Sequence, residues 1–201
     1  MKYFEFLQQI QNRLETLNGF SHELLITDFL APSKDQNSLI VRENVDGPEV
    51  LVCLDEKILK KFSDIKLPGD FSLTNFPDLS IVVEELSHFN TFCQRAMEDH
   101  PISTLELEVQ GEVDKFALAL EILNERNEQT LKHQFFEVLF GEFSVGDWVS
   151  PSQKIIYEEA HLIARQFCRT VLERELSSAE WRREFKRFFG LSKSAKLSPG
   201  H

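Results

Sequence analysis

STLELEVQGEVDKFALALEIL, residues 103–123, decides the fold, because its apolar residues follow the period of an α-helix. They recur at intervals of three and four residues and define one wide apolar face: Leu105, Val109, Val113, Phe116, Leu120 and Leu123. Ser103 and Glu106 form a capping-box pattern, in which each side chain satisfies a free amide at the helix start. About five turns of helix with such a face need a large partner surface. We therefore expect this helix to be the scaffold of the fold.

The N-terminal part of the chain combines helical and strand-like patterns. Residues 2–18 carry apolar residues at helical spacing and end at Asn18-Gly19, a common C-terminal signal of helices. Three strand-like segments follow, HELLITDFL, SLIVREN and EVLVCL, and they are separated by the turn-rich PSKDQN and by VDGP. These patterns predict a three-stranded antiparallel meander. Asp55, at its end, is placed to cap a short helix that runs to Phe62.

The remainder of the chain is mainly helical. One helix, running to about Met97, precedes the central stretch, and a shorter one centred on HQFFEVLF follows it. Ser150 with Gln153 and Ser177 with Glu180 are two further capping boxes, so each serine predicts the start of another helix.

The predicted fold class is therefore α+β: an N-terminal helix, a small antiparallel three-stranded sheet and a short helix, followed by a mainly helical bundle. The segment 66–76 is rich in loop-forming residues, so we expect a small N-terminal part at 1–70 and a helical part at 77–190. One compact domain overall is the alternative, since 201 residues suit either arrangement. Residues 191–201 lack apolar content and predict a disordered tail.

Composition limits the class of function. The net charge of −11 argues against general nucleic-acid binding, which needs clustered lysine and arginine to neutralise phosphates. No apolar run approaches the roughly 18 residues of a membrane span, and the first residues lack the apolar core of a signal peptide. The three cysteines form no CxxC pair, which suits a reducing compartment. We therefore expect an acidic cytoplasmic protein without integral membrane association.

The C-terminal helix AEWRREFKRFFG is basic and aromatic, in contrast to the rest of the chain. From Ser177 onward six basic and two acidic side chains give +4, which leaves −15 on the first 176 residues. Such a helix can dock on an acidic partner or lie on an anionic membrane. The candidate partner-binding residues are Trp181, Arg182, Arg183, Phe185, Lys186 and Arg187. The alternative that we favour is that the aromatic face packs on the protein's own core.

Two Glu-x-x-His patterns on separate helices are the sharpest hint of chemistry. They are Glu85…His88 and Glu158…His161, and the helix between them carries Glu106, Glu108 and Glu112. Paired patterns of this kind build carboxylate-bridged di-metal sites in helical bundles. The candidate metal ligands are therefore Glu85, His88, Glu112, Glu158 and His161.

Helical phase argues against part of this set. At about 100° per residue, Glu158 lies roughly 160° and His161 about 100° from the apolar centre of their helix. The corresponding rotations on the first helix are roughly 60° for Glu85 and 120° for His88, and because Ile81 and Phe92 lie on the same side, this pair can still lie inside a broad apolar face. We therefore interpret these side chains primarily as solvated helix faces, because glutamate is rarely buried unpaired.

The leading functional hypothesis is a non-enzymatic, acidic cytoplasmic interaction protein of the adaptor, accessory-subunit, chaperone or inhibitor type. Its expected partner is another protein of basic character, bound in a salt-sensitive manner. No glycine-rich phosphate loop, nucleophile elbow or dinucleotide fingerprint occurs, so no catalytic residue and no cofactor is expected. The alternatives are a metal-dependent helical-bundle enzyme with a carboxylate and histidine site, and peripheral membrane association through the C-terminal helix.

Overall fold

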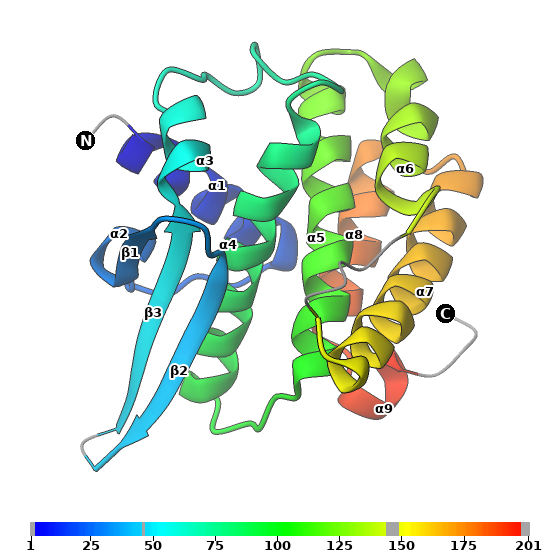
Figure 1. Cartoon of the computed structure of the whole chain (residues 1–201). Coiled ribbons are helices and arrows are strands. Elements are labelled where there is room, and N and C mark those ends of the chain that lie inside the picture. The colour runs from blue at the N-terminus through cyan, green and yellow to red at the C-terminus, as the bar shows by residue number, and fades with distance from the viewer. Residues whose placement is uncertain (1–2, 46, 144–148, 198–201) are drawn as a thin grey trace.

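Helix α5 (Thr104–Glu125) lies at the centre of the protein, as its sequence predicts. The computed structural model describes residues 3–45, 47–143 and 149–197. Figure 1 shows α5 between α4 (Phe76–Met97) and α7 (Pro151–Glu173). Ser103 accepts a hydrogen bond from the amide of Glu106 and completes the predicted capping box. Buried residues occur on nearly every side of α5, so the helix is enclosed by its neighbours rather than packed on one face.

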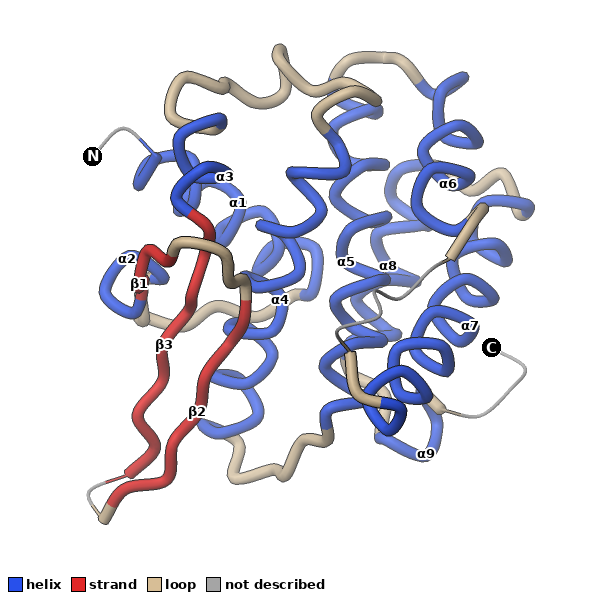
Figure 2. The backbone as a smooth tube through the Cα atoms, viewed as in Figure 1, coloured by secondary structure: helices blue, strands red, loops and turns tan. Residues whose placement is uncertain are grey.

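The α+β class is confirmed by the order of the remaining elements. The helices are α1 (Tyr3–Asn18), α2 (Ile26–Phe29), α3 (Glu56–Lys61), η1 (Gln129–Leu131), α6 (Lys132–Phe140), α8 (Ser178–Phe189) and α9 (Lys193–Lys196). The strands are β1 (Leu30–Ser33), β2 (Ser38–Asn44) and β3 (Gly47–Asp55). Figure 2 shows the three strands together on one side of α4, with the helical part on its other side.

The sheet differs from the predicted antiparallel meander. Its strand order is β1-β3-β2, and β1 runs parallel to β3, while β2 and β3 form the expected antiparallel hairpin. The predicted first strand is mostly not a strand, because residues 26–29 form α2 and only the residues after it pair with β3. Strand β3 lies in the middle of the sheet, because it pairs with β2 along one edge and with β1 along the other.

Both predicted parts contribute to one buried apolar cluster. It includes Leu7 and Ile10 of α1, Val52 of β3, and Phe89 and Phe116 of the helical part. Asp55 caps α3 through the amide of Lys57, as its position after β3 predicts. No helix in the described ranges is both long and apolar enough to cross a membrane.

The predicted disordered tail begins with an ordered segment. Residues 193–196 form α9, capped by Ser192, and the Lys196 side chain is almost completely buried. The ammonium of Lys196 donates to Oε1 of Gln110 in α5 at 3.0 Å and lies over the rings of Phe188 and Phe189. A lysine therefore anchors this segment, which composition alone did not indicate. Residues 198–201 lie outside the described part of the chain.

Candidate metal centre

A group of ionisable side chains lies where α4 faces α5. Helix α4 contributes three of them and α5 the other three, and we call these six residues the α4–α5 cluster: Glu84, Glu85, His88, Glu108, Glu112 and Lys115. Spacings of three and four residues bring members of the same helix onto one face. The two helices pack closely along their length, so both sets of side chains meet in the interior.

Three members of this cluster offer metal-ligand atoms in one place. One ligand atom from each of Glu84, His88 and Glu108 lies within 4.8 Å of the other two. Nε2 of His88 is 3.7 Å from Oε2 of Glu108 and makes no hydrogen bond of normal geometry among the described residues, although the backbone of Leu107 interacts with the imidazole. Two ligands of a tetrahedral ion with bonds of about 2.1 Å are about 3.4 Å apart. Small side-chain rotations are therefore enough to close this set around an ion.

The backbone of α5 makes room for the imidazole. A Cβ atom built on Gly111 would be 3.2 Å from Nε2 of His88 and 3.5 Å from Cγ of Glu84. Any larger residue at this point in α5 would press against His88 and would also contact Glu84. The absence of a side chain at Gly111 therefore allows the imidazole of His88 to approach the backbone of α5.

Glu85 lies behind His88, on the side away from Glu108. Its Oε2 is 3.9 Å from Nδ1 of His88, and its carboxyl group is also hydrogen-bonded by the backbone of Leu39 in β2. Burial raises the pKa of Glu85 to about 9, and the charges of Glu84 and Glu108 act in the same direction. A carboxyl group on the second nitrogen of a ligating histidine is a recurrent feature of metal sites, where it fixes the ring orientation.

Lys115 is the cation of the cluster. Its Nζ lies 2.6 Å from Oε2 of Glu84 and 2.8 Å from Oε1 of Glu112, so it links the two helices. Burial opposes the charged form of Lys115, but the two carboxylates outweigh burial and raise its pKa. The same ammonium lowers the pKa of Glu84, although burial acts in the opposite direction.

The cluster holds more acidic groups than this one cation can balance. Burial raises the pKa of Glu108 to about 8, and the charges of Glu84 and Glu112 add to the effect. Burial also lowers the pKa of His88, so the imidazole is held neutral, the form that ligates metals. Burial is the main cause of the raised pKa values of Glu85 and Glu108, and the negative charges of neighbouring carboxylates add to it.

Helix α7 closes the cluster on its third side. The phenol of Tyr157 is close enough that the charges of Glu108 and Glu84 contribute, after burial, to raising its pKa. His161 is buried, stacks on Phe143 with ring centroids 4.2 Å apart, and lies within electrostatic range of Glu112. Glu84 keeps 28% of its side chain exposed, so the cluster is open to solvent at this residue.

The predicted metal candidates separate into two groups. Glu85, His88 and His161 are buried and Glu112 is half-buried, whereas Glu158 is exposed on α7 and takes no part in the cluster. The expected solvated faces are therefore found at Glu158 but not at the other positions. Two ligand residues, Glu84 and Glu108, were not predicted as ligands. The i,i+4 spacing of Glu84 and His88 was the available signal, because it places both side chains on one helix face.

The candidate partner-binding residues also separate by burial. Trp181 and Phe185 are 5% and 1% exposed and pack into the core. This agrees with the interpretation that the aromatic face of α8 packs on the protein's own core rather than on a partner. Arg183, Lys186 and Arg187 are exposed, and Arg182 is half-buried. Arg182 lies 3.7 Å from Glu121 of α5, so the basic face of α8 meets the protein's own acidic residues.

A second buried polar group surrounds Asp114, one turn of α5 beyond Gln110. Its carboxylate accepts hydrogen bonds from Ser87, Gln110 and Asn18, and burial raises its pKa to about 6. Gln110 in turn accepts from Lys196. These hydrogen bonds join α1, α4, α5 and α9, so we interpret this group as a structural network.

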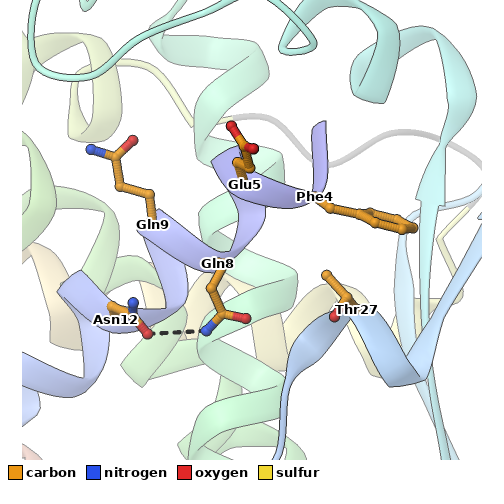
Figure 3. A pocket seen from close by; sticks show the side chains of 6 residues that line it. All are labelled: Phe4, Glu5, Gln8, Gln9, Asn12 and Thr27. Atoms are coloured by element: carbon orange, nitrogen blue, oxygen red, sulfur yellow. Dashed lines mark hydrogen bonds between the residues drawn. The ribbon is translucent and has the colours of Figure 1, made fainter. Parts of the chain in front are cut away.

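The surface pocket in Figure 3 differs from the α4–α5 cluster in its side-chain composition. It is an open depression of about 500 Å³ on the N-terminal half of α1. Its lining consists of Phe4, Glu5, Gln8, Gln9, Asn12 and Thr27. Amides predominate and Gln8 is hydrogen-bonded to Asn12, so the pocket offers no set of metal ligands or paired acid and base groups.

Comparisons with protein-family models, with curated proteins and with solved structures find no match to this chain. Function is therefore inferred from the geometry of the α4–α5 cluster.

Proposed function

We propose that the protein binds a divalent transition-metal ion through Glu84, His88 and Glu108, and that it acts as a metal-dependent helical enzyme. The observation that carries the proposal is the convergence of these three ligand atoms within 4.8 Å, with the buried Nε2 of His88 making no hydrogen bond of normal geometry among the described residues. A buried polar nitrogen without such a bond is costly, and metal coordination removes that cost.

The ligand types favour a first-row transition metal. Imidazole suits zinc and iron, while carboxylates also accept manganese, so a mixed set selects ions of intermediate softness. Ions that prefer all-oxygen shells, such as magnesium and calcium, are a poorer match because His88 supplies nitrogen. Zinc, iron(II) and manganese(II) are therefore the candidate ions.

Three protein ligands support a reactive site rather than a purely structural one. Structural zinc sites are usually closed by four protein ligands, whereas catalytic sites keep one position for water or substrate. A bound metal lowers the pKa of such a water and creates a nucleophile near neutral pH. The partly exposed side chain of Glu84 leaves an approach for solvent to this position.

The surrounding charges also support a bound cation. The charge of a divalent ion would allow Glu108 and Glu85 to ionise, and both carry raised pKa values in its absence. Glu85, now 3.9 Å from Nδ1, would orient His88 once it moves into hydrogen-bonding distance, and Lys115 would hold Glu84 in position.

Calorimetric titration of the chelator-treated protein with Zn²⁺ tests binding. We expect one well-defined binding event in the wild type and its loss in His88→Ala and Glu108→Gln. Glu158→Gln is the matched control, because Glu158 belongs to the sequence pattern but is exposed on α7. Equal affinity in all four proteins would contradict the assigned ligands.

The open coordination position needs its own test. In protein loaded with Co²⁺ in place of zinc, we expect azide or thiocyanate to change the visible absorption spectrum, since a small anion can replace a bound water. A spectrum that is insensitive to both anions would indicate a closed structural site and would remove the enzymatic part of the proposal.

The protein-binding function predicted from charge remains a separate prediction. The net charge of −11 motivates it, but Trp181 and Phe185 are buried and are not available as anchors. The cations of α8, the acidic faces of the other helices and exposed apolar side chains such as Ile155 and Leu162 then remain as surfaces for a partner. Loss of binding at raised salt is the expected behaviour of such a complex.

A further inference from the structure

We infer that the outward side of α7 binds the same side of a second copy of the chain, with the two helices antiparallel across a two-fold axis. We call this surface the α7 outer face, and its residues recur at intervals of three and four along the helix: Ile155, Glu158, Glu159, Leu162, Arg165 and Arg169. Figure 1 shows α7 along the outer side of the helical part. The ligands of the proposed metal site take no part in this surface, so it is independent of the proposed function.

Two large apolar side chains of the α7 outer face are exposed. Ile155 and Leu162 are 63% and 61% exposed, more than any other described large apolar side chain except Val45 at the hairpin turn. They are seven residues apart and so lie in line along the helix, which is the spacing by which paired helices bury apolar side chains. Phe143, 40% exposed, stacks on the ring of His161 and adds apolar surface at one border of the face. These side chains supply the apolar centre that an interface needs.

The charged side chains of the α7 outer face are divided into two halves. Glu158 and Glu159 lie on the N-terminal side of Leu162, and Arg165 and Arg169 lie on its C-terminal side. Within the described part of the chain, none of these four charges belongs to an ion pair. An antiparallel pair centred on Leu162 brings the acidic half of each copy beside the basic half of the other. A parallel pair would instead bring like charges together.

The balance of charge on the α7 outer face favours a second copy over other partners. The whole chain carries −11, so two copies repel each other on average. On this face two acidic and two basic side chains cancel, which removes the repulsion locally. A two-fold axis makes the contact isologous, so one self-complementary surface is sufficient. A strongly acidic or strongly basic partner would match only half of the face.

Sedimentation equilibrium over a range of protein concentrations tests the association. One helix face is small beside stable interfaces, which bury about 800 Å² on each partner, so the dimer should be weak and concentration-dependent. In chelator-treated protein we expect a reversible monomer–dimer equilibrium. Leu162→Asp should abolish it, because two like charges then meet at the axis. Met97→Asp is the matched control, since Met97 is exposed to a similar extent at the end of α4 and should keep the equilibrium.

Charge-reversed variants test the antiparallel arrangement. Reversing the acidic half with Glu158→Lys and Glu159→Lys should abolish the dimer, because the lysines then meet the arginines of the other copy. Adding Arg165→Glu and Arg169→Glu should restore it, since reversal of both halves recreates opposite charges across the axis. A parallel pair gains nothing from the second reversal, so restoration is specific to the antiparallel arrangement.

Three results would overturn the inference. A wild type that is monomeric at every concentration would leave the face to a partner of another kind. A dimer that persists in both Leu162→Asp and the acidic-half variant would place the contact on another surface. A folded fourfold variant that stays monomeric would exclude the antiparallel arrangement. If the fourfold variant does not fold, the first two results still decide, because Glu158, Glu159 and Leu162 are exposed and tolerate substitution.

Discussion

The imidazole of His88 rests against the bare backbone of Gly111, where a Cβ atom would be only 3.2 Å from Nε2. In a helix interior alanine is about 1 kcal/mol more favourable than glycine. Helix propensity therefore gives no reason for a glycine in the middle of α5, whereas close packing of the ligand does. This relationship leads to a prediction that separates metal binding from stability.

Gly111→Ala should weaken zinc binding by about tenfold or more, which corresponds to about 1.4 kcal/mol. The added methyl group displaces Nε2 of His88, while the better helix propensity keeps the stability of the metal-free protein unchanged or higher. Calorimetric titration and thermal unfolding measure the two effects. Gly69→Ala is the control, because its Cβ would meet nothing closer than 3.7 Å. Unchanged affinity in Gly111→Ala would contradict the placement of His88 as a ligand.

Zinc binding at pH 7 should release a proton from Glu108. Burial holds the pKa of this carboxyl group at about 8, so it is mostly protonated at pH 7 and has to ionise before it can ligate. Affinity should therefore rise as pH increases toward 8. Titrations in buffers with different ionisation enthalpies count the released protons. A binding enthalpy that is the same in every buffer would show that no proton leaves and that Glu108 is not a ligand.

Lys196 should make the unfolding free energy depend on pH in alkaline solution. Burial lowers its pKa from 10.5 to about 8, so between these values the native state binds fewer protons than the unfolded state. Stability should accordingly rise with pH in this window, relative to Lys196→Met, by up to about 1.4 kcal/mol per pH unit. Urea unfolding at several pH values measures the difference. Lys193→Met, at an exposed position of the same helix, keeps Lys196 and should therefore keep the wild-type slope.

The two kinds of residue on α8 should respond differently to truncation. Trp181→Ala should lower the unfolding free energy by about 3–5 kcal/mol, because the indole is buried against Phe185. Arg183→Ala should change it by no more than about 0.5 kcal/mol, since Arg183 is exposed. Chemical denaturation provides both values. Near-equal effects would contradict the packing of the aromatic face on the core.

Most of the helical architecture followed from local sequence signals. Capping boxes at Ser103, Ser150 and Ser177 all form as predicted, because the two partners in each are three residues apart and need no distant information. Strand order was not accessible in this way. The parallel pairing of Leu30 with Val52 depends on how α2 returns the chain to the sheet, which is a long-range contact.

The candidate site was predictable only in part. Helical phase identifies the side chains on a single buried face of a helix, whereas α4 is buried on two faces. Helix α4 lies between the sheet and α5, so side chains far from its apolar centre are still buried, as His88 shows. Rotation correctly placed Glu158 in solvent, since it is exposed on the outer face of α7. The ion pair of Lys115 with Glu84 crosses between helices and has no signature in a single sequence.

The central claim is that Glu84, His88 and Glu108 hold a metal ion, and anomalous diffraction from crystals grown with Zn²⁺ tests it most directly. The predicted result is one strong peak at the zinc edge, about 2.1 Å from Nε2 of His88 and within bonding distance of both carboxylates. Zinc at other positions only, with Nε2 of His88 still uncoordinated, would contradict the account.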